Sequence, residues 1–310
     1  MNRRSMLVAA AMVTLAAMAI PSAEASFPGL NGKLLFMSSR DGNSEIYVMS
    51  ADGSGAANLT RNTAYDGEAA WSADGTKIAF SSFRAGNFEI YVMNADGTGV
   101  KRLTRNSWSD RDPAWSPDGK KIVFASARGK DPGTDLWVMN ADGKKPIQLT
   151  QTFGMEHEPV WSPDGTWIAF RGTVGCCTSS EPPDLYVVRT DGSSRINVTN
   201  TPSVYESSPD WYPAPAISRL VFGACDGTCV GSGPIDWEIY TMDVPGSPVR
   251  LTFDTTPDGA PVWSPDGTRI VFGSSRDGDE EVYVMNADGT SVAPLTVNEV
   301  MDQRPDWQAI

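Results

Sequence analysis

Short runs of alternating apolar and polar residues recur along most of the chain, and polar turn segments containing Asp-Gly separate them. One kind of run has the form Ile-x-Phe, as at residues 78–80. A second opens with an acid and continues through an aromatic residue, as at 89–94, and a third ends in Leu-Thr, as at 103–104. Runs this short, bounded by Asp-Gly turns, predict β-strands joined by tight hairpins.

These runs belong to an internal repeat in which a Trp returns at intervals of 44 to 52 residues. The repeated Trp residues are Trp71, Trp115, Trp161, Trp211, Trp263 and Trp307, the following Phe residues are Phe36, Phe80, Phe124, Phe170, Phe222 and Phe272, and the Leu/Val-Thr ends fall at Thr60, Thr104, Thr150, Thr199, Thr252 and Thr296. Each unit holds four strand-sized segments, which is typical of a propeller blade. The repeat therefore predicts an all-β fold, a six-bladed β-propeller of four-stranded antiparallel blades.

The phase of the repeat predicts how the ring closes. The first apolar run, at 34–36, has the pattern of a second strand, and the last, Pro-Asp-Trp at 305–307, is a lone first strand. We expect the N-terminal and C-terminal strands to pair within one blade, because closure hides the edges that an unfinished sheet exposes. A linear solenoid would need capping repeats.

Residues 1–25 have the pattern of a signal peptide: a basic start at Arg3 and Arg4, an apolar run over 6–20, and the small-residue end Ala-Glu-Ala at 23–25. The apolar run is shorter than the roughly 20 residues that span a bilayer as a helix. We expect cleavage, a propeller domain over 26–310, a periplasmic or secreted location and no membrane insertion afterwards. Residues 3–7 also resemble a twin-arginine export signal, and an uncleaved anchor is the alternative.

Charge narrows the choice of partner. Lys and Arg number 25 against 38 Asp and Glu, which leaves a formal net charge of −13. This balance argues against binding to nucleic acid or to anionic lipid. We expect a monomer whose partner is a protein or peptide with a cationic segment.

The repeat unit reads P-x-W-S-P-D-G-x-x-I-x-F, then S-x-R-x-G, then E-I-Y-V-M-N-A-D-G. It resembles the TolB-type six-bladed propeller repeat, which also builds the propellers of prolyl-oligopeptidase-like peptidases. The resemblance covers residues 30 to 310 and implies that the Trp strand is the innermost of each blade. TolB carries an α/β domain ahead of its propeller and the peptidases carry an α/β-hydrolase domain; because the repeat fills residues 30 to 310, we expect neither domain here.

An acid stands five residues before every repeated Trp. These acids are Asp66, Asp110, Glu156, Glu206, Asp258 and Asp302. Four second strands are followed by an arginine, at Arg40, Arg84, Arg128 and Arg276, and every third strand opens with an acid, at Glu45, Glu89, Asp135, Asp184, Glu238 and Glu281. One interpretation is a structural brace in which each arginine bridges carboxylates within a blade. The other, which needs the inner position that the resemblance implies, is a ring of oxygens at the channel mouth suited to Ca²⁺ or to a cationic segment.

Two blades lack the arginine, because Val174 and Asp226 stand at its position. We therefore expect Glu156 and Glu206 to be the carboxylates most available to a ligand, and we predict a partner-binding surface from Glu156, His157, Glu206 and Asp226.

All four cysteines, Cys176, Cys177, Cys225 and Cys229, lie in the enlarged loops of these two blades. In an exported protein they are disulfide candidates with three possible pairings, of which we favour Cys225 with Cys229 or two bridges between blades. A Cys₄ zinc site is the alternative, although adjacent cysteines lack the usual ligand spacing.

The motifs favour a protein that is not an enzyme. His157 is the single histidine, and neither G-x-S-x-G nor a phosphate-binding loop occurs. We expect an exported, non-catalytic scaffold with no cofactor beyond possible Ca²⁺. The alternatives are a lyase-like enzyme acting on polysaccharide, since related propeller repeats occur in lyases, and a Ca²⁺-binding structural component of the envelope.

Overall fold

The computed structural model describes residues 29–129, 133–175, 182–226 and 236–310. The predicted signal peptide at 1–25 lies outside the described residues, as do Cys176, Cys177 and Cys229. Within the described ranges, no helix is long and apolar enough to cross a membrane.

The described chain forms six four-stranded antiparallel sheets, which confirms the predicted all-β propeller. The innermost strands are β4 (Asp66–Trp71), β8 (Asp110–Trp115), β12 (Glu156–Trp161), β16 (Val204–Trp211), β20 (Asp258–Trp263) and β24 (Asp302–Ala309). The second strands are β1 (Asn31–Ser38), β5 (Lys77–Ser82), β9 (Lys121–Ser126), β13 (Trp167–Gly172), β17 (Arg219–Asp226) and β21 (Arg269–Ser274). The third strands are β2 (Glu45–Met49), β6 (Glu89–Asn94), β10 (Asp135–Asn140), β14 (Asp184–Arg189), β18 (Glu238–Asp243) and β22 (Glu281–Asn286). The outer strands are β3 (Ala57–Asn58), β7 (Lys101–Arg102), β11 (Ile147–Gln148), β15 (Ile196–Asn197), β19 (Val249–Arg250) and β23 (Ala293–Pro294).

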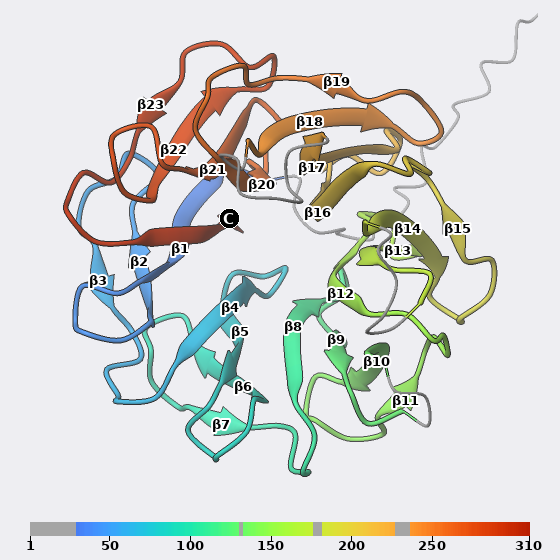
Figure 1. Ribbon diagram of the computed structural model, residues 1–310. Helices are drawn as coiled ribbons and strands as arrows, with labels where there is room; N and C mark the ends of the chain where they lie inside the picture. The colour runs from blue at the N-terminus through green and yellow to red at the C-terminus, as the bar shows by residue number, and fades with distance from the viewer. Residues whose placement is uncertain (1–28, 130–132, 176–181, 227–235) are drawn as a thin grey trace, which may run out of the picture.

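The blades stand around a central channel, with the two-residue strands at the perimeter (Figure 1). Blade 1 consists of β24, β1, β2 and β3, and blades 2 to 6 follow as β4–β7, β8–β11, β12–β15, β16–β19 and β20–β23. The Trp strands are innermost, because each contacts the Trp strand of the next blade. We call the face where the inner strands begin the mouth face, and the opposite face the far face.

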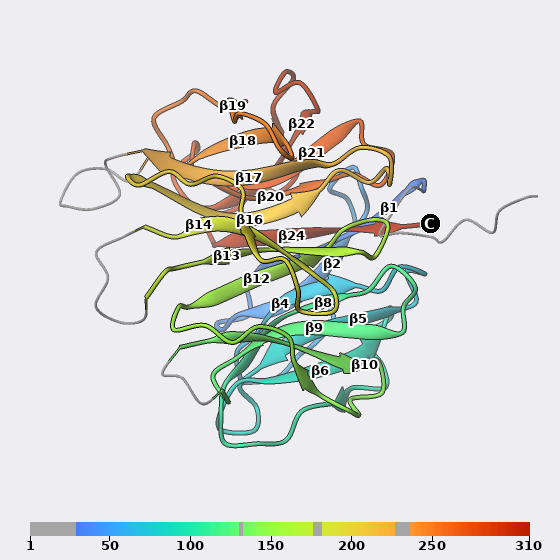
Figure 2. The same cartoon turned by 90° about the vertical axis from the view of Figure 1, so that its right-hand side faces the viewer.

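Blade 1 closes the ring as the phase of the repeat predicted. β1 pairs antiparallel with β24, from Asn31 opposite Ala309 to Ser38 opposite Asp302. At the far face, Leu30 and Ile310 exchange backbone hydrogen bonds of 2.9 and 3.1 Å. Figure 2 shows the C-terminal end of β24 beside the start of β1 on this face.

The core lies between the blades. Ile78, Ala79 and Phe80 of β5 are all buried, because a middle strand packs on both of its neighbouring blades. The cluster that contains Leu35 and Ile46 of blade 1 also contains Trp71 of blade 2, and five similar clusters join the other neighbours. Burying such a side chain contributes roughly 1.5–3 kcal/mol, so the repeated apolar positions hold the ring together.

Every inner strand contains a β-bulge, which determines what faces the channel. In blade 2 the pairing with β5 passes from Gly67 opposite Ser81 to Ala70 opposite Ala79, so the inner strand carries one extra residue. The same shift occurs in the other blades. The bulged residues have φ between +48° and +55°, and they are Glu68, Asp112, Glu158, Ser208, Ala260 and Arg304. Proline follows five of them, which fits a bulge because proline has no N–H to leave unpaired.

Candidate functional site

In four blades the predicted arginine pairs with the acid that opens the inner strand, but its Nε donates to a serine of the second strand instead of bridging to the acid of the third strand. In blade 2, Arg84 Nη2 donates to Asp66 Oδ2 at 2.6 Å and Nε donates to Ser82 Oγ at 2.8 Å. The guanidinium lies over the rings of Phe80 and Tyr91, 5.4 and 5.0 Å from their centroids. The equivalent ion pairs are Arg40–Asp302, Arg128–Asp110 and Arg276–Asp258.

The expectation that Glu156 and Glu206 are the most available carboxylates is wrong, because both are buried. Arg195, from the turn before β15, replaces the missing arginine: its Nε donates to Glu156 Oε1 at 3.2 Å. Burial raises the pKa of Glu156. Sequence reasoning missed Arg195 because it lies at a different position of the repeat, although arginine also occurs on the outer strands of blades 2 and 5, as Arg102 and Arg250.

Glu206 is enclosed without an arginine among the described residues. Thr201 Oγ1 donates to Oε1 at 2.7 Å and the backbone N–H of Leu185 donates to Oε2 at 3.2 Å. Burial raises the pKa of Glu206 to about 7. Asp226 ends β17, but its side chain lies outside the described part of the structure.

The six predicted carboxylates do not fit a shared Ca²⁺ site, because each is buried and has hydrogen-bond or ion-pair partners within the protein. Among the described residues, no group of three or more His, Cys, Asp or Glu side chains could hold a metal ion. The residues that do line the channel come two to four positions later, at the bulge and the two positions after it.

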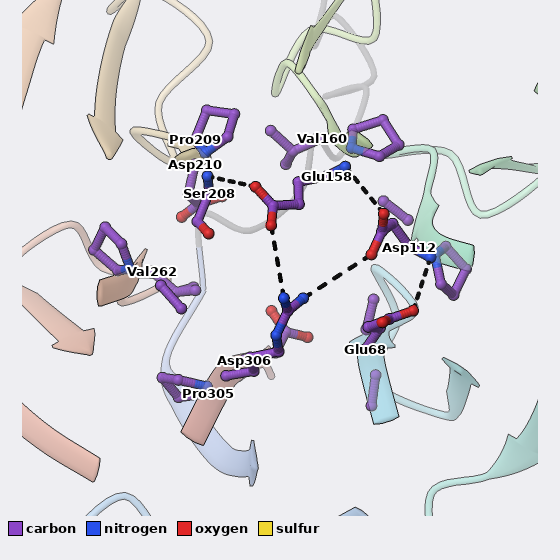
Figure 3. Close-up of a pocket in the computed structure, with 18 residues that line it drawn as sticks. Glu68, Asp112, Glu158, Val160, Ser208, Pro209, Asp210, Val262, Pro305 and Asp306 are labelled. Atoms are coloured by element: carbon purple, nitrogen blue, oxygen red, sulfur yellow. Dashed lines mark hydrogen bonds and ion pairs between the residues drawn. The ribbon is translucent and has the colours of Figure 1, made fainter. Parts of the chain in front are cut away.

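Three bulged acids link neighbouring blades around one side of the channel (Figure 3). Glu68 Oε2 accepts the backbone N–H of Asp112 at 3.2 Å, and Asp112 Oδ2 accepts that of Glu158 at 3.3 Å. Glu158 Oε2 in turn accepts the backbone N–H of Ser208 at 2.8 Å. On the other side of the channel the bulged residues are Ser208, Ala260 and Arg304. Among the six bulged residues, the acids are therefore confined to one half of the channel wall.

His157 lies at the mouth, as predicted, and its partner is an acid of the channel wall. Its Nδ1 lies 3.0 Å from Asp112 Oδ2. Burial alone would raise the pKa of Asp112, but the hydrogen bond and charge of His157 and the charges of Arg304 and Arg111 hold that pKa below its usual range. Arg111 also binds Glu68, with Nε 3.0 Å from Oε1.

Two further acids lie deeper in the channel. Asp210 Oδ2 accepts the backbone N–H of Trp263 at 2.8 Å, and Asp306 Oδ2 accepts that of Trp71 at 2.7 Å, so each acid joins two neighbouring blades. Desolvation raises the pKa of Asp210 to about 8 and that of Asp306 to about 7. The other blades have Ala or Val at this position.

A groove of about 470 Å³ extends from the mouth over blades 5 and 6 and β24. It exists because Ser207 and Gly259 stand where blades 3 and 4 carry Arg111 and His157. A Cβ added at Gly259 would meet no atom within 4 Å. Arg171, Trp237 and Arg304 also line the groove, among others.

Large, exposed apolar side chains occur on the mouth face in the connections that lead into four inner strands. We call this set the apolar rim; its members are Trp108, Phe153, Phe253 and Val297, with exposed fractions of 51%, 66%, 74% and 77%.

Comparison with known proteins identifies the family. The TolB β-propeller domain matches this sequence over residues 16–130, 109–224 and 179–309. The chain belongs to the TolB β-propeller family.

Solved structures agree with this assignment. TolB from Acinetobacter baumannii is similar with a TM-score of 0.71 and 18% identity, over 89% of this chain and 66% of that one. A TolB-type protein from Agrobacterium tumefaciens gives a TM-score of 0.59 and 25% identity, over 83% and 90% of the two chains. An oligogalacturonate lyase in complex with manganese shares the fold, with a TM-score of 0.59 and 17% identity over 87% and 75%.

The match to curated relatives is partial. An uncharacterized protein of Agrobacterium fabrum is 32% identical over 120 residues, which are 37% of this chain and 36% of that protein. The match thus spans about a third of that relative, and this TolB-family propeller covers just under two thirds of the Acinetobacter TolB.

Proposed function

We propose that this TolB-family propeller is an exported, non-catalytic scaffold that binds a segment of a protein partner across the channel mouth. The observation that carries the proposal is the apolar rim on the mouth face, the same face on which the charged channel mouth opens. Exposed large apolar residues grouped on one face are typical of protein interaction sites, and the charges inside the rim would give specificity. The net charge of −13 favours encounter with a partner of net positive charge.

The experiment compares substitutions of three exposed apolar residues at two different places on the surface. The test variant changes Trp108, Phe153 and Phe253 to Ser. The matched control changes Ile147, Ile196 and Val249 to Ser, which are also exposed but lie on the outer strands.

Each immobilised protein is incubated with an extracytoplasmic fraction, and the bound proteins are quantified by mass spectrometry. We expect the test variant to capture at least about tenfold less of a specific protein than the wild type does. The control variant should capture as much of that protein as the wild type. Equal capture by both variants would show that the rim does not bind the partner.

A lyase-like activity is the second candidate, favoured by the fold shared with the oligogalacturonate lyase and by the position of His157 beside arginines at the mouth. Cleavage of a uronic-acid polymer that is lost in His157→Ala would support it over the scaffold. Absence of cleavage by the wild-type protein would remove it.

A further inference from the structure

The acids of the channel mouth already have donors. Glu68 accepts from Arg111 and from the N–H of Asp112, and Asp112 accepts from His157 and from the N–H of Glu158. Glu158 accepts from the N–H of Ser208. These three acids therefore have few lone pairs left for a ligand, whereas Glu280, a further acid that lines the groove, interacts with the charge of Arg304.

Two arginines at the mouth, Arg171 and Arg304, have fewer close partners than these acids. Among the described residues, no group pairs with the guanidinium of Arg171, which is half-buried beside His157. The ion pairs of Arg304 are long, at 4.0 Å to Asp112 and 3.7 Å to Glu158. Both distances exceed a hydrogen bond, so guanidinium N–H groups remain for another acceptor.

Arg171 and Arg304 face the same space. Both line the groove of about 470 Å³ and a second cavity of about 180 Å³ at the acidic side of the mouth. The half-buried indole of Trp237 lines the groove as well. Guanidinium groups bind carboxylates through paired N–H donors, and partial burial strengthens this interaction relative to the open surface.

We propose that Arg171 and Arg304 form a carboxylate-binding subsite in this groove, and that the bound partner segment presents a carboxylate from its C-terminus or from an Asp or Glu side chain. The inference rests on the proposed function and names the group recognised. The subsite recognises a single carboxylate, and a partner that carries one carboxylate at this place can still have a positive net charge.

The test uses three synthetic peptides in calorimetric titrations. The first is Ser-Gly-Ser-Gly-Ser with a free C-terminus and an acetylated N-terminus, the second is the same peptide amidated, and the third is acetylated and amidated with a central Glu. We expect at least one carboxylate peptide to bind at least about tenfold more tightly than the neutral peptide. The first and third peptides distinguish a terminal from a side-chain carboxylate.

Three variants locate the binding. Arg171→Gln is expected to reduce carboxylate binding to the level of the neutral peptide, and Gly259→Leu is expected to weaken it by filling the groove. Arg219→Gln is the matched control, because Arg219 is an arginine on the far face that pairs with Asp243, and it should leave the affinity unchanged. Unchanged thermal unfolding shows that each variant is folded.

Several results overturn the proposal: equal affinity for neutral and carboxylate peptides, no binding of either carboxylate peptide, or full affinity in Arg171→Gln. Tighter binding of trigalacturonate than of either peptide would overturn the peptide as the source of the carboxylate. None of these titrations involves the apolar rim, so failure of the subsite and failure of the proposed function are distinguishable.

Discussion

At the scale of the residue, position within the repeat decides the role of a charge. Asp110 and Asp112 are two residues apart on β8, yet Asp110 is fully buried against Arg128 whereas Asp112 lies on the channel wall. The first stabilises a blade and the second links blades at the mouth. Acids at the two positions are therefore expected to respond differently to substitution.

Arg128→Ala removes the charge partner of a fully buried carboxylate. Breaking a buried pair from one side destabilises by about 3–5 kcal/mol, because the remaining charge is uncompensated. We expect a loss of this size in the free energy of unfolding measured with urea. Arg219→Ala is the control, since its pair with Asp243 is exposed and such pairs contribute about 0–1 kcal/mol. Adding Asp110→Asn should recover part of the loss, and a loss as small as that of the control would contradict a stabilising role for the pair.

Asp210 and Asp306 predict a dependence of stability on pH. Their folded-state pKa values of about 8 and about 7 lie above the unfolded value of 3.8. Between these limits the folded state holds protons that the unfolded state has released, so the contribution of these two carboxyls to stability is fully present below the unfolded pKa and is lost as pH rises through the folded pKa values. Each carboxyl contributes a slope of at most about 1.4 kcal/mol per pH unit.

The double variant Asp210→Asn/Asp306→Asn should flatten this slope in urea unfolding measured from about pH 5 to about pH 8. Asn retains an acceptor for the backbone N–H groups of Trp263 and Trp71. Glu206 and Glu238, whose pKa values burial raises to about 7, should leave part of the slope. The same slope in wild type and variant would show that the channel acids are not its source.

At the scale of the element, the bulge of each inner strand determines which side chains reach the channel. It holds six residues other than glycine in the left-handed region, which costs an L-residue about 1–2 kcal/mol. In Glu68, Asp112 and Glu158 the hydrogen bonds between blades offset this strain. Ala260 has no such side-chain bond.

Ala260→Gly is therefore expected to stabilise the protein by up to about 1 kcal/mol, because glycine adopts φ near +48° without strain while losing more entropy on folding. Ala70→Gly is the control, since Ala70 lies on an inner strand outside the left-handed region, and it should destabilise by about 0.5–1 kcal/mol. Thermal unfolding of both variants measures the difference. Equal destabilisation would mean that the bulge is not strained at Ala260.

At the scale of the whole molecule, β24 carries the closure of the ring. Deleting residues 302–310 leaves β1 without its inner neighbour. It also removes the contacts of β24 with the neighbouring blades, through β4 on one side and β20 and β21 on the other. We expect loss of a single cooperative unfolding transition, measured by calorimetry, because an open sheet edge and an unfilled core replace a closed ring.

A circular permutant keeps every blade and serves as the control. Ile310 is joined to Gly29 by a short linker, and the chain is opened at the exposed Ser107 between blades 2 and 3. The backbone bonds between Leu30 and Ile310 place these ends side by side. Cooperative unfolding should persist in the permutant, and an unchanged transition in the deletion would contradict closure by β24.

The sequence by itself determined the strands, the number of blades, the pairing of the end strands and the four pairs of an arginine with the acid that opens an inner strand. These follow from short-range rules, because alternation, Asp-Gly turns and a fixed repeat place equivalent residues in equivalent environments. Only the tertiary structure decided which residues face the channel, since one extra residue in a strand changes the direction of the side chains that follow it. It also decided that Arg195 pairs with Glu156 from another repeat position, and that desolvation raises the pKa of Asp210, because both depend on neighbours brought together by the ring.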